Sequence, residues 1–167
     1  MHNCFLLLGS NLGNRLAYLR LAIEKIAQQV GEILQISPVF ETEPWHFEAE
    51  ANFLNCALEV FTLKTPAEIL KCTQEIEQQL GRQKPAAQGY FSREIDIDIL
   101  FFDDEVLVQE NLEIPHPRIA ERRFVLEPLC CIAPQKVHPV FKKNISELLA
   151  ICADNSKVEQ FNQPIFQ

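Results

Sequence analysis

The order of strand-type and helix-type segments limits the folds available to this chain more than any other feature. Short runs of apolar and β-favouring residues predict strands, and apolar residues spaced three or four apart predict helices. The predicted strands are 4–8, 33–40, 53–63 and 94–102, and the predicted helices run from Asn14 to Gly31 and from Thr65 to about Leu80. Thr65 with Pro66 and Glu68 has the spacing of a helix N-terminus closed by a capping box. The resulting order is β-α-β-β-α-β.

This order is the split βαβ pattern of α+β, ferredoxin-like folds, in which two helices pack on one face of an antiparallel sheet. Residues 106–108 predict a return strand after 94–102, which adds a β-hairpin. Beyond Pro115 the sequence predicts only short helices and a strand-like segment at 124–131. At 167 residues, with 47% of them apolar, we expect one domain over 1–167, in which 151–167 form a C-terminal extension without an assigned role.

Charge and cysteine content exclude several classes of protein. A net charge of -8 argues against nucleic-acid binding, which depends on Lys and Arg that neutralise phosphates, so we expect small-molecule substrates. No apolar run approaches the ~18 residues of a membrane span, and the N-terminus does not resemble a signal peptide. The six cysteines show no C-x-x-C spacing and lie mostly in apolar segments, which is typical of free thiols. We expect a cytoplasmic monomer.

A strict alternation at 93–100 (REIDIDIL) identifies the segment that carries the chemistry. In a strand, this pattern sends Ile95, Ile97 and Ile99 to one face and the acids to the other. Asp96 and Asp98 then lie roughly 7 Å apart on one face, where their carboxylates can bind metal ions roughly 4 Å apart, as in two-metal phosphoryl-transfer sites. Oxygen ligands of this kind favour magnesium.

Two acids on an alternating strand more often form only a solvated face. Their surroundings favour a site, because six of the fifteen basic residues fall between positions 82 and 123. These are Arg82, Lys84, Arg93, Arg118, Arg122 and Arg123. A basic cluster beside paired carboxylates suits a metal-bound polyphosphate.

Other features allow both an ordinary and a functional interpretation. Residues 9–15 (GSNLGNR) lack the G-x-x-x-x-G-K-[ST] spacing of a phosphate-binding loop, so we interpret them as a tight turn between strand and helix. Trp45, Phe53 and Phe124 are of a type that is most often core. Phe53 shares a strand face with Asn55, however, and a ring beside an amide that donates and accepts hydrogen bonds suits a nitrogen-rich heterocycle.

Four blocks of sequence together resemble the 6-hydroxymethyl-7,8-dihydropterin pyrophosphokinase family. They are GSNLGN at 9–14, FLNCALEV at 53–60, SREIDIDILFFDDEV at 92–106 and IPHPRIAERRFVLEPL at 114–129. The resemblance implies transfer of a pyrophosphoryl group from ATP to the hydroxymethyl group of the dihydropterin, with release of AMP and the assistance of two Mg²⁺ ions, in folate synthesis.

The resemblance also implies roles for individual residues. Asp96 and Asp98 correspond to metal ligands, and Arg82 and Arg93 to arginines that engage phosphates. The nucleotide site would be lined by Gln74, Glu77, Lys84, Tyr90, His116 and Arg122. The pterin ring would lie between Phe53 and Phe124, with its edge bound by Thr42, Trp45 and Asn55.

Three departures from the commoner family pattern affect the loops. Glu43 stands where proline is frequent, Lys84 where a second arginine is frequent, and YFSR at 90–93 where many relatives have W-G-P-R. Lys cannot reproduce the bidentate contact of Arg, so these changes bear on how nucleotide is bound. Two alternatives remain: an inactive paralogue that binds metal or nucleotide, and a ferredoxin-like RNA-binding module.

Overall fold

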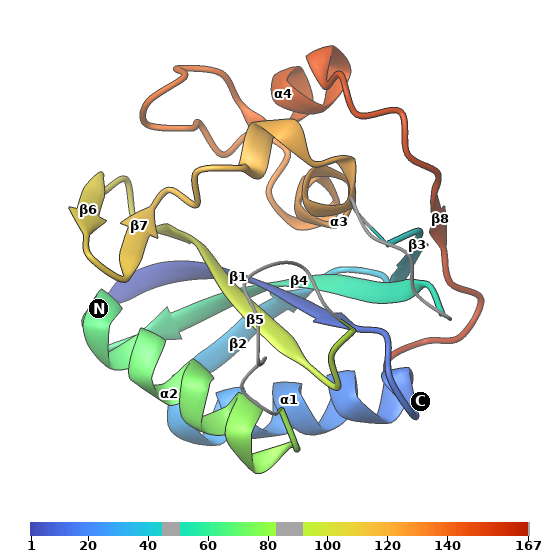
Figure 1. Ribbon diagram of the computed structural model, residues 1–167. Helices are drawn as coiled ribbons and strands as arrows, with labels where there is room; N and C mark the ends of the chain where they lie inside the picture. The colour runs from blue at the N-terminus through green and yellow to red at the C-terminus, as the bar shows by residue number, and fades with distance from the viewer. Residues whose placement is uncertain (45–50, 83–91, 167) are drawn as a thin grey trace.

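The predicted sheet is present, and β1 (His2–Ser10) is one of its inner strands (Figure 1). The computed structural model describes residues 1–44, 51–82 and 92–166. Its other sheet strands are β2 (Glu32–Ile36), β3 (Phe40–Thr42), β4 (Phe53–Thr62), β5 (Asp96–Phe102) and β8 (Val158–Gln160). β1 pairs antiparallel with β4 and with β5, while β4 also pairs with β2 and β3. This is the strand arrangement of a ferredoxin-like fold, as the sequence predicts.

Two helices cover one face of this sheet, α1 (Arg15–Gln29) and α2 (Pro66–Gln79) (Figure 1). The side chain of Asn14 caps α1 by accepting a hydrogen bond from the amide of Ala17 at 3.1 Å. Thr65 and Glu68 form the predicted capping box at the start of α2. Both helix starts are therefore encoded by local hydrogen bonds.

The alternation in β5 divides its side chains between the two faces, as predicted. Ile95, Ile97 and Ile99 are at most 5% exposed and belong to the core between the sheet and the two helices. The same core contains Leu6, Leu8, Leu19, Ile23, Ile26, Leu54, Leu58, Ile69 and Ile76. Asp96 and Asp98 consequently lie on the opposite face of the sheet.

That opposite face is covered by α3 (Arg123–Ile132), with α4 (Ile145–Ile151) packed on α3 (Figure 1). The prediction of a strand-like segment at 124–131 was wrong. Buried positions in α3 are Val125, Leu126, Pro128 and Leu129, which is helical spacing. Among the described residues, no helix is both long enough and apolar enough to cross a membrane.

Two strand predictions also need correction. The single strand predicted for 33–40 is divided into β2 and β3 around Ser37 and Pro38, because proline has no amide hydrogen to donate to a ladder. The predicted return strand is β6 (Leu107–Gln109), which pairs not with β5 but with β7 (Leu112–Ile114) in a separate hairpin.

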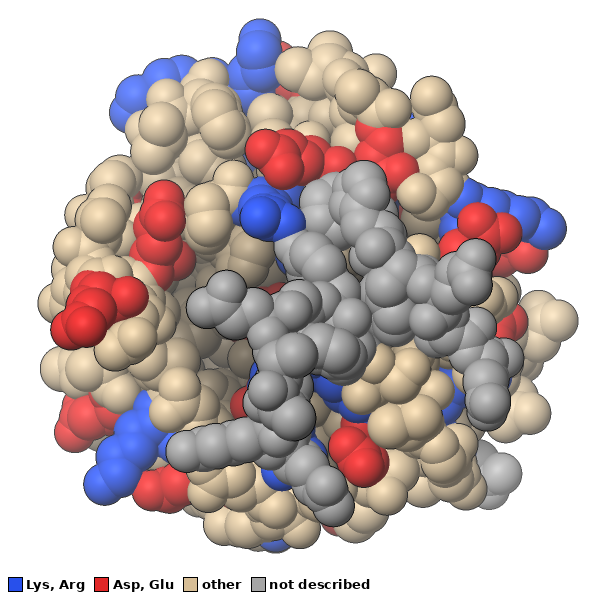
Figure 2. All heavy atoms as spheres, in the orientation of Figure 1, with Lys and Arg blue, Asp and Glu red and all other residues tan. Residues whose placement is uncertain are grey.

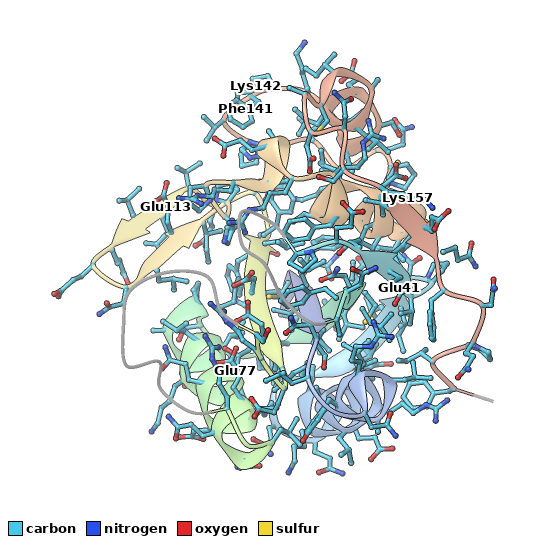
Figure 3. The ribbon with its side chains drawn as sticks, turned by 45° about the vertical axis from the view of Figure 1, so that its right-hand side comes forward. Glu41, Glu77, Glu113, Phe141, Lys142 and Lys157 are labelled. Atoms are coloured by element: carbon cyan, nitrogen blue, oxygen red, sulfur yellow. The ribbon has the colours of Figure 1, made fainter. Side chains whose placement is uncertain are left out.

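The C-terminal segment closes the outer edge of the sheet. β8 pairs with β3, so Glu41 and Glu159 lie opposite each other, and Lys157 lies just before β8 (Figure 3). Asp154 accepts a hydrogen bond from the amide of Arg123, at the first turn of α3, at 2.9 Å. The side chain of Arg20 on α1 donates to the carbonyl oxygen of Ile165. Residues 151–166 are therefore an integral part of the packed structure.

We expect Asp154→Ala to lower the free energy of unfolding by about 1 to 2 kcal/mol, because the amides of Arg123 and Ser156 lose their acceptor. Urea denaturation measures this change. Asp104→Ala is a matched control: its carboxylate is exposed and pairs with Lys136 at the surface, so its loss should cost less than about 1 kcal/mol. Equal destabilisation by both variants would contradict a specific role of Asp154 in anchoring the C-terminal segment.

Candidate active site

A pocket of about 310 Å³ lies on the α3 side of the sheet, where β1 ends and β4 and β5 begin. Side chains from the sheet form its floor, and the segment from His116 to Phe124 forms a wall. The lining residues are Leu7, Gly9, Thr42, Glu43, Phe53, Asn55, Arg93, Asp96, Asp98, His116, Pro117, Arg118, Arg122 and Phe124. Nine of the fifteen predicted site residues are thus brought together in one pocket.

The strand register determines which side chains share the floor. Gly9 on β1 lies directly between Asn55 on β4 and Asp96 on β5, and Leu7 lies beside Asp98. A Cβ atom at position 9 would come within 2.9 Å of the Oδ1 atom of Asn55. Glycine is therefore required at position 9 so that Asn55 can lie across it.

Two arginines meet the carboxylate of Asp96. The Nη1 atom of Arg93 lies 2.7 Å from Oδ1 of Asp96, and that of Arg82 lies 3.0 Å from the same oxygen. Arg82 also forms an ion pair with Glu77, a buried residue that projects from α2 toward β5 (Figure 3). Glu77 accepts a hydrogen bond from the amide of Ile97 at 2.8 Å, so α2 is tied to the strand that carries the acids.

The two other carboxyl groups of this cluster, those of Asp98 and Glu77, both have raised pKa values. Burial, with the charge of Asp96, raises the pKa of Asp98 to about 7. Burial and the same neighbouring charge raise the pKa of Glu77 to about 7. Positive charge from Arg122 and Arg93 opposes the shift of Asp98. The cluster thus concentrates negative charge at a point where a bound cation would relieve it.

The wall of the pocket carries a neutral imidazole and a buried cation. Burial and the nearby Arg122 lower the pKa of His116 to about 4, so His116 is uncharged at pH 7. Its Nδ1 atom accepts from the amide of Arg118 at 3.2 Å, which assigns the ring proton to Nε2. Arg122 is 7% exposed, and its guanidinium carbon lies 5.5 Å from the centre of the Phe124 ring, a cation–π contact.

The other end of the pocket contains two aromatic rings and the uncharged polar side chains of Thr42 and Asn55. Phe53 comes from the sheet and Phe124 from α3, so the two rings line the pocket from different elements. Asn55 is buried, and its Nδ2 atom donates to the hydroxyl of Thr42 at 2.8 Å. This bond fixes the orientation of the Asn55 amide, as hydrogen-bond recognition of a flat ring requires.

The carboxylate groups that line the pocket are of a kind that can bind the predicted magnesium. Asp96 and Asp98 supply carboxylate oxygens, and the described residues contain no group of three His, Cys, Asp or Glu that could hold a metal ion. Magnesium typically binds one or two carboxylates and completes its shell with water and substrate phosphates. Two acids at the edge of a pocket therefore fit magnesium that arrives with a polyphosphate.

The other predicted residues lie elsewhere. Trp45, Lys84 and Tyr90 lie outside the described residues. Gln74 is exposed on α2 and does not line the pocket. Arg82 and Glu77 contact the acid cluster from its α2 side.

Five pocket residues have no predicted site role: Leu7, Gly9, Glu43, Pro117 and Arg118. The sequence did single out Arg118 as part of the basic cluster and Glu43 as a departure. Leu7 and Gly9 could have been found only from the register of β1 against β5.

Charges of both signs are mixed on the face that Figure 2 shows. Lys and Arg side chains lie near Asp and Glu side chains at several places in this view, and uncharged residues cover most of the rest of the described surface.

Solved structures share this fold. The chain matches the crystal structure of Plasmodium falciparum HPPK-DHPS wild type with a TM-score of 0.74 at 18% sequence identity. The match covers 89% of this chain and 44% of that longer chain. At this identity the likeness establishes the fold alone.

Sequence comparison is more specific. The chain is 41% identical over 147 residues to a 2-amino-4-hydroxy-6-hydroxymethyldihydropteridine pyrophosphokinase of Aquifex aeolicus, covering 88% of this chain and 90% of the relative. A protein of the same name from Porphyromonas gingivalis is 44% identical over 137 residues, covering 81% of this chain and 92% of the relative. The family model described as 7,8-dihydro-6-hydroxymethylpterin-pyrophosphokinase (HPPK) matches residues 5–134. The chain belongs to the 7,8-dihydro-6-hydroxymethylpterin-pyrophosphokinase family.

Proposed function

We propose that this enzyme transfers the pyrophosphoryl group of ATP to the hydroxymethyl group of 6-hydroxymethyl-7,8-dihydropterin, releasing AMP and the pterin diphosphate for folate synthesis. One observation carries the proposal: a single pocket joins two carboxylates and arginines to a subsite of aromatic rings and an oriented amide. Such a pocket can hold a polyphosphate at one end and a flat heterocycle at the other. Relatives at 41% and 44% identity are named as pyrophosphokinases.

Asp96 and Asp98 are the residues that would hold two magnesium ions. When bound, these ions would neutralise phosphate charge and polarise the phosphorus that is attacked. The raised pKa of Asp98 supports this role, because a carboxylate that resists ionisation in the empty site gains most from a cation beside it.

Arg82 and Arg93 would bind the phosphates of ATP. In the ligand-free protein both guanidinium groups share one oxygen of Asp96, and phosphate oxygens offer them partners of the same charge and geometry. Gln74, Glu77, Lys84, Tyr90, His116 and Arg122 complete the proposed nucleotide site. His116, being uncharged, would contribute a hydrogen bond through its Nε2 proton.

Phe53 and Phe124 would hold the pterin ring between them, while Thr42, Trp45 and Asn55 bind its polar edge. The hydroxymethyl oxygen would then attack the β-phosphorus of ATP as the bond to the α-phosphate oxygen breaks. Transfer of this kind depends on positioning and charge neutralisation more than on a covalent role of the protein. A pocket that holds both substrates in position can therefore support this transfer without a covalent role of the protein.

We also propose that the enzyme is located in the cytoplasm. All six cysteines are free, a state that the reducing cytoplasm maintains. The proposed oligomeric state is a monomer. An inactive paralogue is disfavoured because Arg93, Asp96 and Asp98 are all retained and lie in the pocket.

Incubation with ATP, magnesium and 6-hydroxymethyl-7,8-dihydropterin should yield AMP and a pterin diphosphate in equal amounts. Pyrophosphoryl transfer cleaves ATP between its α and β phosphates, so nucleotide chromatography distinguishes it from single-phosphate transfer. Stoichiometric ADP would assign an ordinary kinase activity and exclude the proposed reaction.

Asp98→Asn should lower kcat on the order of 100-fold, a barrier increase of about 2.7 kcal/mol, because the amide is a weak neutral ligand for magnesium. Steady-state assays at saturating magnesium measure this loss. Asp96→Asn should behave similarly. Near-wild-type turnover in a folded variant would exclude that residue as a metal ligand.

The same Asp98→Asn variant should melt at or above the wild-type temperature without ligand at pH 8. The folded protein holds a proton on Asp98 up to a pKa of about 7, well above the ordinary carboxyl value, so this group's contribution to stability falls as pH rises through that window. The advantage of the variant should shrink toward pH 5, where wild-type Asp98 is protonated. A variant less stable than wild type at pH 8 would contradict the pKa assignment.

Asn55→Ala should weaken pterin binding by about 1 to 3 kcal/mol, because polar groups on the ring edge lose their partner. Affinity for a magnesium-bound ATP analogue should change little, since Asn55 lies on the aromatic side of the pocket. Calorimetric titration with each ligand measures both effects. Equal losses for the two ligands would indicate general damage to the site instead.

A further inference from the structure

The turn after β1 holds Arg93 through a single residue, Asn11. The amide nitrogen of Asn11 donates to the carbonyl oxygen of Arg93 at 3.0 Å, and its side-chain Oδ1 accepts from the amide of Arg93 at 2.7 Å. Arg93 precedes β5 and has no place in a strand ladder, whose last pair is Gly9 with Asp96. Asn11 therefore makes the hydrogen bonds to the backbone of Arg93 that a neighbouring strand would make within the sheet.

The other end of the Asn11 amide reaches a second part of the pocket. Its Nδ2 atom donates to the hydroxyl of Ser92 at 3.0 Å and to the carbonyl oxygen of Ala51 at 3.4 Å. Ala51 lies two residues before Phe53, whose ring lines the aromatic end of the pocket. One side chain thus joins the segment that leads to the acids with the segment that leads to Phe53.

The chemistry of these bonds requires an asparagine amide. The amide of Arg93 can only donate and the carbonyl of Ala51 can only accept, so the two ends of the Asn11 amide cannot be exchanged. An aspartate would lack both side-chain donors, and an alanine would leave the amide of the half-buried Arg93 without this acceptor. Asn11 is only 2% exposed, so water cannot readily replace the lost bonds.

We propose that Asn11 is a positioning residue for the transfer reaction: it holds the backbone of Arg93, so that the guanidinium group of Arg93 is placed beside Asp96 at the phosphate end of the pocket. The inference rests on the proposed function for its catalytic consequence. It gives the GSNLGN motif a role that is neither direct phosphate binding nor a turn alone. The physical reason is that the side chain of Arg93, which lies 2.7 Å from Asp96, extends from a backbone that Asn11 holds by two hydrogen bonds.

A double-mutant cycle with Arg93 tests whether Asn11 acts through that arginine. Asn11→Ala alone should lower kcat by about 10- to 100-fold, since small misplacements of a charge-stabilising group are costly. Added to Arg93→Ala, it should lower kcat by less than about 3-fold more. Equal losses in both backgrounds would overturn the proposal, because they would show that Asn11 does not act through Arg93.

Thr62→Ala is the matched control for a loss of stability. Thr62 is also a buried polar residue that makes two hydrogen bonds, to Val30 and Lys64, but it lies at the opposite end of β4 from the pocket. Both variants should melt at lower temperature, and only Asn11→Ala should lose kcat. If Thr62→Ala, at a similar loss of melting temperature, loses as much turnover, Asn11 is merely structural.

Amide hydrogen exchange separates this inference from the proposed reaction. In the ligand-free protein the amide of Arg93 should exchange at least 10-fold faster in Asn11→Ala than in wild type, with no such change in Thr62→Ala. This measurement needs no turnover, so it decides the positioning of Arg93 even if the wild-type protein forms no AMP. Unchanged exchange at Arg93 would overturn the proposal.

Discussion

The antiparallel pairing of β1 with both β4 and β5 is the constraint on which the rest of the structure depends. It places Gly9 between Asn55 and Asp96, so a residue proposed to bind the heterocycle and a residue proposed to bind metal lie in one row of the sheet. A shift of one residue in the pairing of β5 with β1 would turn the acids into the apolar core and the isoleucines out of it. Burial of Ile95, Ile97 and Ile99 therefore enforces the register that assembles the site.

The site brings negatively charged carboxylates close together, and neighbouring arginines offset this charge. Asp96, Asp98 and Glu77 lie close together, and the raised pKa values of Asp98 and Glu77 record the resulting repulsion and burial. Arg82 and Arg93 meet this charge by sharing one oxygen of Asp96. The same arginines suit phosphate, so binding of a metal-bound polyphosphate would exchange one set of ion pairs for another at little net cost in charge.

Local patterns were enough to predict the main elements, because each is encoded by neighbouring residues. The capping box at Thr65, the cap at Asn14 and the alternation around Asp96 all depend on contacts within a few positions. The errors concern tertiary packing. The apolar run from Phe124 is a helix because its buried positions follow the helical period against the sheet, and β6 pairs with β7 because β5 ends at a bend after Phe102. Pairing of Gly9 with Asp96 likewise joins residues far apart in sequence, which no local pattern reveals.

Residues beyond the family match also contribute to the packing around the pocket. The family model ends at residue 134, yet β8 at 158–160 pairs with β3 and sets Val158 opposite Thr42. Thr42 in turn accepts the hydrogen bond that orients Asn55. Arg15 from α1 reaches the same strand through Glu41 at 2.7 Å. β3 is thus held on its outer edge by β8, which lies beyond the matched residues 5–134, so the geometry around Thr42 and Asn55 depends on packing as well as on the residues that line the pocket.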